Sequence, residues 1–291
     1  MPRSVYFLQC VPGRVLRLDP ETRNVTTVVD KLNSHPDGLV VVDGRVYWTN
    51  MGPAASNGLH FFEADGSVQS AALDGSDVRA DVAQGQFVTG KQMTFADGQL
   101  YWTDREGMRV LRARPDGSSL EVLVQTGEFP GDAQDATRHC VGIAVDTATG
   151  RLFWTQKGPP KGGRGRIFTA PLDRAGQDPA HRDDIVVLSD NLPEPIDLEL
   201  SADGRTLFWT DRGDAGSGGN SLNCAELENG QLKNARLLAS GFDETIGLAV
   251  DEAAGTIYVT DLGGTVYAYR EGKTEKLVTG LSLLTGIALG E

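Results

Sequence analysis

The segment Gly38-Leu-Val-Val-Val-Asp-Gly-Arg-Val-Tyr-Trp-Thr-Asn50 decides the fold, because related segments return along the whole chain. Each one joins a short apolar stretch to an aromatic stretch through a turn rich in Asp and Gly. The aligned positions in the second stretch lie 50 to 55 residues apart. They are Trp48, Trp102, Trp154, Trp209 and, in the last segment, Val259. A period of about 40 to 55 residues with several short alternating strands in each unit is typical of a β-propeller.

Each unit divides into four expected strands, and the two ends of the chain share one unit. Residues 285–290 resemble a first strand with nothing after it, whereas residues 4–29 supply a second, third and fourth strand. Pairing of these two segments would close the ring and remove its open edge. The sequence therefore predicts an all-β, six-bladed β-propeller with four-stranded blades, formed by residues 1–291 as a single domain.

The amino-acid composition indicates which binding partners are unfavourable and which cellular compartment is expected. The 291 residues include 27 basic and 40 acidic side chains, a net charge of -13 that disfavours nucleic acid and anionic membranes as partners. No apolar run reaches the roughly 18 residues of a membrane span, and the N-terminus does not resemble a signal peptide. Three cysteines without metal-ligand spacing favour a reduced, cytoplasmic protein. A secreted protein whose leader has been removed stays open, as does the oligomeric state.

The recurring tetrapeptides carry a family resemblance. They are Tyr47-Trp-Thr-Asn, Tyr101-Trp-Thr-Asp, Phe153-Trp-Thr-Gln, Phe208-Trp-Thr-Asp and Tyr258-Val-Thr-Asp. They resemble the YWTD repeat, also called the low-density lipoprotein receptor class B repeat, over essentially the whole chain. The resemblance implies a six-bladed propeller but no particular function. Receptors of this kind carry a cysteine-rich module beside the propeller, and its lack in this sequence leads us to expect a stand-alone propeller.

We interpret the repeated motif residues as structural. Aromatic side chains at one register of every blade are expected to pack between blades. The motif's terminal carboxylates, Asp104, Asp211 and Asp261, are expected to accept hydrogen bonds from backbone amides at strand ends.

Functional residues are expected where the blades differ, around one mouth of the axis. The first strands begin with Gly38, Gln92, Gly142, Asp197, Gly247 and Gly286, and we expect the glycines to keep the axis open. Residues one or three positions earlier would face the same space. This alignment predicts proton transfer by His35 or His139, with Asp197 as a polarising carboxylate. The predicted substrate-binding residues from it are Asp37, Lys91, Gln92, Glu194, Glu244 and Thr285. The alternative interpretation is a set of solvated loop residues.

Long loops on the same face suggest a lid over an apolar ligand. The insertion 51–63 carries His60, Phe61 and Phe62, and the connection 126–139 carries Phe129. The three phenylalanines are the predicted apolar walls of the substrate site.

Three functional hypotheses follow. The first is a protein- or ligand-binding propeller without catalysis. The second is a lactonase- or esterase-like hydrolase similar to the gluconolactonase propellers, which needs a hard cation bound by oxygen ligands. Because Asp197 is the one acidic residue among the six residues that begin the first strands, we predict no metal. The third, which we place first, is an enzyme without metal or cofactor that acts on an apolar small molecule. It rests on similarity to fungal propellers of tropolone–sesquiterpenoid pathways, which are hetero-Diels–Alderases that join a quinone methide to a terpene alkene.

Overall fold

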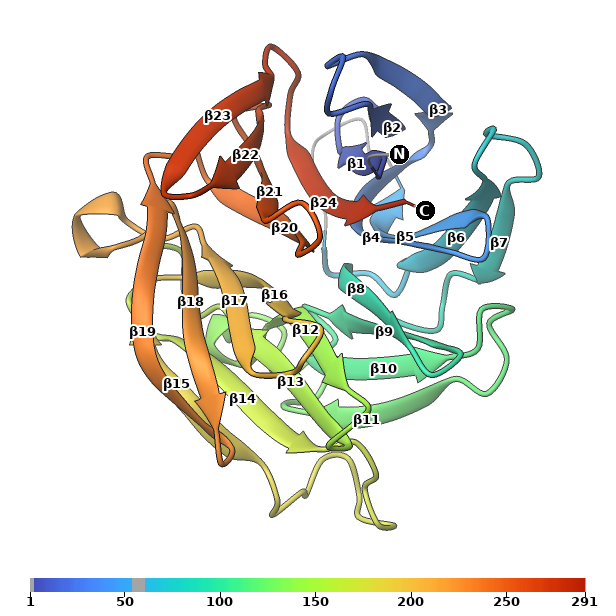
Figure 1. The fold of residues 1–291 in the computed structure, drawn as a ribbon. Helices are drawn as coiled ribbons and strands as arrows, with labels where there is room; N and C mark the ends of the chain where they lie inside the picture. Colours follow the sequence, from blue (N-terminus) through green and yellow to red (C-terminus); the bar gives the residue numbers. More distant parts are fainter. Residues whose placement is uncertain (1–2, 54–60, 291) are drawn as a thin grey trace.

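The computed structural model describes residues 3–53 and 61–290, which form six four-stranded antiparallel sheets arranged around an axis (Figure 1). The innermost strands are β24 (Leu284–Leu289), β4 (Ser34–Val42), β8 (Gly90–Ala96), β12 (Cys140–Asp146), β16 (Pro195–Leu200) and β20 (Thr245–Asp251). The second strands are β1 (Val5–Gln9), β5 (Arg45–Pro53), β9 (Gln99–Asp104), β13 (Arg151–Gln156), β17 (Thr206–Asp211) and β21 (Thr256–Asp261).

The third strands are β2 (Gly13–Leu18), β6 (Ser67–Ala72), β10 (Arg109–Ala113), β14 (Gly165–Pro171), β18 (Ser221–Glu228) and β22 (Val266–Arg270). The outermost strands are β3 (Val25–Leu32), β7 (Arg79–Val82), β11 (Glu121–Gln125), β15 (Val186–Leu192), β19 (Gln231–Ser240) and β23 (Lys273–Val278). Two short 3₁₀ helices lie in loops, η1 (Ala136–Arg138) and η2 (Ala215–Ser217). Within the described ranges, no helix has the length and apolar character needed to cross a membrane.

The ring closes through the two ends of the chain, as the sequence predicts. Strand β24 pairs antiparallel with β1, with Ile287 opposite Phe7 and Leu289 opposite Val5. Figure 1 shows β24 beside the N-terminal strands, so the C-terminal strand completes the first blade. The prediction of a six-bladed, four-stranded propeller is confirmed.

Apolar clusters between neighbouring blades form the core. Trp102 is fully buried and packs with Tyr47, Val68 and Phe87 of the preceding blade, and its ring centroid lies 5.6 Å from that of Phe87. Trp48, Trp154 and Trp209 occupy the equivalent clusters at other junctions. Burial of each such ring contributes about 2–3 kcal/mol. The expectation that the motif aromatics pack between blades is confirmed.

The motif threonines join the blades by hydrogen bonds. Thr155 Oγ1 accepts from the Gly142 amide (2.7 Å) and donates to the Ile196 carbonyl of the next blade (2.8 Å). Donation to the next blade is repeated by Thr49, Thr103, Thr210 and Thr260. Leu8 stands at the motif position in the first blade, where Thr285 Oγ1 instead donates to the Pro36 carbonyl at 3.0 Å. Every blade junction therefore has a buried hydroxyl bond near the axis.

The ring glycines serve the same junctions. A Cβ atom on Gly142 would lie 2.1 Å from the Ile196 carbonyl oxygen, and one on Gly38 would lie 2.3 Å from the Lys91 carbonyl oxygen. The sequence interpretation assigned these glycines to an open axis, whereas the structure shows that they allow innermost strands to approach closely.

The terminal carboxylates of the motif bind backbone amides, as expected. Asp104 Oδ1 accepts from the Thr89 amide at 2.7 Å, and Asp211 Oδ1 accepts from the Glu194 amide at 2.9 Å. These bonds fix the start of each innermost strand relative to the end of the second strand in the same blade.

Candidate functional site

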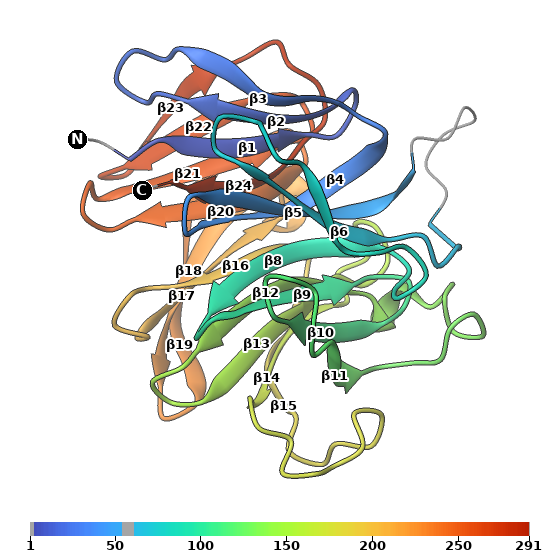
Figure 2. The ribbon, with the colours of Figure 1, turned by 90° about the vertical axis from the view of Figure 1, so that its right-hand side faces the viewer.

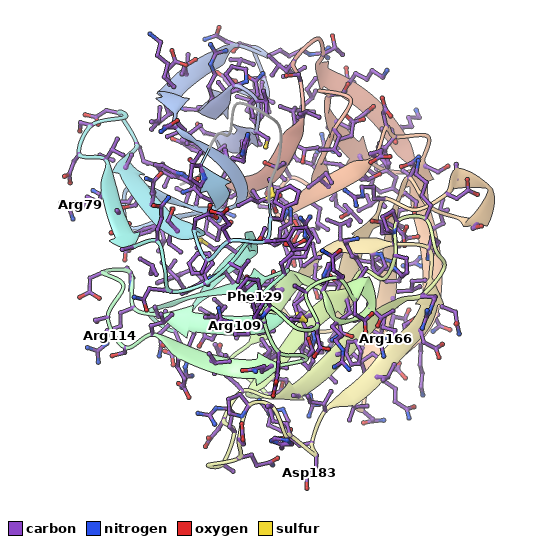
Figure 3. The ribbon with its side chains drawn as sticks, turned by 180° about the vertical axis from the view of Figure 1, so that it is seen from behind. Arg79, Arg109, Arg114, Phe129, Arg166 and Asp183 are labelled. Atoms are coloured by element: carbon purple, nitrogen blue, oxygen red, sulfur yellow. The ribbon has the colours of Figure 1, made fainter. Side chains whose placement is uncertain are left out.

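A cavity of about 450 Å³ occupies one end of the propeller axis. It lies on the face where the loops after the second strands emerge. In side view, the chain termini lie on the opposite side of the molecule from the C-terminal end of β5 (Figure 2). Figure 3 looks onto the cavity face, with Arg166 on β14 and Phe129 in the loop before η1. The cavity is therefore built from blade differences at the axis, where the sequence predicts the functional site.

One residue from each blade contributes to the wall, the residue that directly follows the second strand or its motif. These six residues are Cys10, Met51, Arg105, Lys157, Arg212 and Leu262. The three cations come from three consecutive blades, whereas the uncharged residues come from the other three. Ile246 and Leu283 extend the uncharged side. The cavity consequently has a cationic side and a side that is apolar except for the ion pair of Lys91 and Asp37 beside Met51.

The cations are held by buried carboxylates. Lys157 Nζ and Arg212 Nη2 both bond to Glu194 Oε1, at 3.4 and 2.5 Å, and Glu194 is 1% exposed. Arg105 Nε donates to Glu106 Oε1 at 2.6 Å. Each of these cations is thus fixed in place without leaving the cavity wall.

A second ion pair joins two predicted residues. Lys91 Nζ bonds to Asp37 Oδ2, while Asp37 Oδ1 accepts from Gln92 Nε2 at 3.2 Å. Lys91 and Asp37 both line the cavity, and both are more than nine-tenths buried.

Burial and mutual repulsion make these ammonium groups easier to deprotonate. Burial is the main cause that lowers the pKa of Lys157 to about 8. Glu194 opposes this shift, and the charges of Arg105 and Arg212 add to it. Burial also lowers the pKa of Lys91, against the attraction of Asp37. A lysine with a pKa near 8 can donate a proton close to neutral pH.

His139 is part of the cavity wall, and one of its ring nitrogens has no hydrogen-bond partner among the described residues. Its Nε2 lies 2.9 Å from the Ala133 carbonyl oxygen, which can only accept, so Nε2 carries the hydrogen and Nδ1 is the basic nitrogen. Nδ1 is buried and has no hydrogen-bond partner among the described residues, and the same holds for Glu106 Oε2. Burial lowers the pKa of His139, which keeps the imidazole neutral. Two residues of the cavity wall therefore each carry a buried acceptor atom that has no hydrogen-bond partner in the described structure.

The structure brings part of the predicted set together at this cavity. The predicted residues that line it are Asp37, Phe61, Phe62, Lys91, His139 and Thr285. Glu194 lies behind Lys157, and Glu244 lies 3.8 Å from Arg212 Nε without lining the cavity. Arg105 lies over the ring of Phe61, 4.4 Å from its centroid. His60 is outside the described residues.

Two predicted residues lie in other surroundings on this face. His35 is buried within β4, and burial lowers its pKa; it does not line the cavity. Phe129 is 36% exposed and shares a separate cavity of about 300 Å³ with Arg109 (Figure 3).

Asp197 and Gln92 line a cavity of about 440 Å³ at the other end of the axis. Asp197 Oδ2 accepts from the Leu248 amide of the next blade at 3.0 Å, so this carboxylate joins two blades. Burial raises its pKa to about 7 and also raises the pKa of neighbouring Glu199. Asp197, predicted to polarise His35 or His139, therefore lies at the other end of the axis from the cavity that His139 lines.

The sequence interpretation missed Met51, Arg105, Glu106, Lys157 and Arg212. Four of them follow the second strand or its motif directly, so the same repeat alignment could have found them. Among residues 3–53 and 61–290, no group of three or more His, Cys, Asp or Glu side chains is placed to hold a metal ion.

Comparison with known proteins gives related fungal sequences, although no family model matches the chain. A Pyricularia oryzae protein named low-density lipoprotein receptor-related protein 1 is 47% identical over 294 residues, which cover 95% of this chain and 92% of that protein. The 3-hydroxyacyl-CoA dehydrogenase-like protein LAM1 of Cochliobolus heterostrophus is 39% identical over 87% of this chain. The match spans only 55% of LAM1. A chain in the crystal structure of a nidogen/laminin complex has the same fold, with a TM-score of 0.74, 21% identity, and coverage of 99% of this chain and 98% of that chain.

Proposed function

This chain belongs to the low-density lipoprotein receptor-related family of YWTD propellers, and we propose that it is an enzyme that converts an apolar small molecule inside the 450 Å³ cavity. The proposal rests above all on His139, a residue of the cavity wall whose buried Nδ1 has no hydrogen-bond partner in the described structure. A buried polar atom without a hydrogen bond costs about 1–3 kcal/mol, and a bound substrate would recover that cost.

The chemistry needs one proton acceptor and one proton donor. Neutral His139 supplies the acceptor at Nδ1, and the Lys157 ammonium, with its pKa of about 8, supplies the donor. Both side chains line the cavity, and the Lys157 amide donates to the His139 carbonyl at 3.3 Å. This bond ties the loop that carries His139 to the start of the loop after β13.

We propose formation of a quinone methide followed by cycloaddition. The substrate of this step is a hydroxybenzyl alcohol, which carries a phenolic and a benzylic hydroxyl. His139 removes the proton of the phenolic hydroxyl. Lys157 protonates the benzylic hydroxyl, and that oxygen leaves as water. The quinone methide then joins an alkene in a hetero-Diels–Alder step that forms one C–O and one C–C bond and needs no further proton. Met51, Leu262 and Leu283 would hold the alkene partner in position on the apolar side. A proton passing from His139 back to Lys157 restores the enzyme.

The test compares two histidine variants against the unaltered protein. His139→Gln keeps an amide that can donate to Ala133, and His181→Gln is the control at an exposed histidine. Each protein is incubated with a metabolite extract of the source organism, and the extract is followed by mass spectrometry.

We expect the unaltered protein and His181→Gln to consume a metabolite and to form a product that has lost water. His139→Gln should be slower by at least about tenfold. Equal turnover by His139→Gln would refute the role of His139. A metabolite that is retained unchanged by all three proteins would instead support a binding propeller without catalysis. Loss of turnover on treatment with a chelator would support the hydrolase alternative.

A further inference from the structure

The charge of the cavity contrasts with the charge of the protein. The chain has a net charge of -13, yet four cations line this cavity: Lys91, Arg105, Lys157 and Arg212. Three buried carboxylates bond to them, Asp37 to Lys91, Glu106 to Arg105, and Glu194 to both Lys157 and Arg212. Since Glu194 serves two cations, these described residues around the cavity include one more cation than carboxylates.

The nearest additional carboxylate does not fill that place. Glu244 lies 3.8 Å from Arg212 Nε, but it lies closer, at 3.1 Å, to the ammonium of Lys161. Lys161 does not line the cavity, and its charge offsets that of Glu244. A buried positive charge without a counterion is unfavourable, and an anion bound beside it removes that cost.

The positions of the cations around the axis determine the orientation that a bound ligand would take. Arg105, Lys157 and Arg212 follow the second strands of three consecutive blades, while Met51, Leu262 and Cys10 occupy that position in the other three. Ile246 and Leu283 add apolar surface on the second side. A molecule with charge at one end and an apolar body fits both sides at once.

We infer that the cavity binds an amphipathic acid, with one oxyanion against Arg105, Lys157 and Arg212 and with its apolar body against Ile246, Leu262 and Leu283. The inference rests on the proposed function, because it names the substrate class for that same cavity. A hydroxyl group next to the oxyanion would donate to His139 Nδ1, which satisfies the remaining buried acceptor. The oxyanion is a carboxylate or an ionised phenol, since either would form charge-assisted hydrogen bonds with these cations.

The test uses two fluorescent probes that differ by one charge. 8-Anilinonaphthalene-1-sulfonate has the apolar body of N-phenyl-1-naphthylamine together with one sulfonate. Binding of each probe is titrated to the unaltered protein, to Lys157→Met, and to Lys233→Met as the control, because Lys233 is an exposed lysine on β19. Lys157→Met leaves Glu194 bonded to Arg212, so the buried carboxylate keeps a counterion.

We expect Lys157→Met to weaken the sulfonate probe about tenfold and the neutral probe less than about twofold. Lys233→Met should change neither, and Lys157→Arg should retain binding of the sulfonate. An equal loss of both probes with an unchanged melting temperature would overturn the oxyanion inference. Unchanged sulfonate binding in a folded Lys157→Met variant would overturn it as well.

Competition then separates the two acids. All competitors are compared at pH 7, below the pKa of Lys157. Displacement of the sulfonate probe by 2-naphthoate identifies a carboxylate site, displacement by 2,4-dinitro-1-naphthol, which is ionised at this pH, identifies a phenolate site, and 2-naphthol is the uncharged control. Equal displacement by 2-naphthol and by the two anions would show that charge is not recognised, which overturns the inference while the small-molecule cavity of the proposed function stands. If neither probe binds the unaltered protein, the proposed function fails with it.

Discussion

The Nε2 atom of His139 lies 2.9 Å from the carbonyl oxygen of Ala133, and this bond determines what the imidazole offers to the cavity. It holds the hydrogen on Nε2 and leaves Nδ1 as a buried acceptor without a hydrogen-bond partner in the described structure. The loop 126–139 thus fixes the tautomer of His139 and also contributes Ala133, Gln134 and Ala136 to the cavity wall.

The tautomer of His139 is the first prediction. Long-range ¹H–¹⁵N correlation spectra should show His139 with hydrogen on Nε2 only, and His139→Gln assigns the resonance. Because burial lowers the pKa of His139 below the ordinary value of 6.5, the ring should stay neutral as pH is lowered from 8 to 6.5. The neutral imidazole therefore contributes to the free energy of unfolding above pH 6.5, and this contribution is lost as pH falls through the lowered pKa. A hydrogen on Nδ1, or a midpoint above 6.5, would contradict this assignment.

The threonine at a blade junction gives the second prediction. Thr155→Val removes both the acceptor for the Gly142 amide and the donor to the Ile196 carbonyl. We expect a loss of about 2–3 kcal/mol in the free energy of unfolding by urea, whereas Thr155→Ser should lose less than about 1 kcal/mol because it keeps the hydroxyl. Equal losses for the two variants would mean that packing of the methyl group, rather than the hydrogen bonds, stabilises the junction.

The third prediction concerns pH and Asp197. Its pKa in the folded protein, about 7, lies above the 3.8 of an exposed aspartate, so the folded state holds this proton more tightly. The resulting stability is full below pH 3.8 and is lost as pH rises through 7, by at most about 1.4 kcal/mol per pH unit.

Asp197→Asn removes that dependence. The asparagine keeps only one of the two acceptors used by the Leu198 and Leu248 amides, a cost of about 1 kcal/mol at every pH. Relative to the unaltered protein, the variant should therefore gain stability between pH 5 and pH 8 in urea titrations. The exposed substitution Asp97→Asn should not change the pH profile. Parallel profiles for Asp197→Asn and the unaltered protein would show that this carboxylate does not titrate in that range.

The closing strand gives the fourth prediction. Deletion of residues 285–291 removes most of β24, the partner of β1 in the first blade, together with the Thr285 bond to Pro36. We expect loss of the cooperative melting transition or aggregation, because the deletion exposes a strand edge at the axis. A chain that lacks only residue 291 is the control. An unchanged melting temperature for the longer deletion would contradict the role of β24 in closing the ring.

The repeat predicted the fold because packing between blades requires the same residue type at the same register in each blade. The candidate site was predicted in part. Alignment of the first strands of the six blades predicted His139, Asp37 and Lys91 as site residues. That alignment, however, treated the six strands as equivalent in structure. The pairing of β4 with β5 and that of β12 with β13 each contain register shifts near the cavity. Those irregularities place His35 inside a strand and His139 at the end of η1.

Local hydrogen bonds within loops also determine where some side chains lie, and the repeat carries no information about these loops. The Glu128 amide donates to Asp132 Oδ2 at 3.0 Å and the Asp132 amide donates to the Glu128 carbonyl at 2.7 Å, which makes a tight turn around Phe129. The ring of that residue consequently faces a separate cavity. By contrast, Lys157 and Arg212 directly follow their motifs, at a position where the residue type differs from blade to blade, so the repeated residues themselves do not indicate it.

The most direct test of the central claim is a crystal structure of the protein in complex with the metabolite that it converts. The account predicts ordered density in the 450 Å³ cavity, with an acidic oxygen within hydrogen-bond distance of Lys157 Nζ and a hydroxyl oxygen at His139 Nδ1. An ordered metabolite beside Asp197 at the other end of the axis, or on the outer strands with only solvent in this cavity, would contradict it.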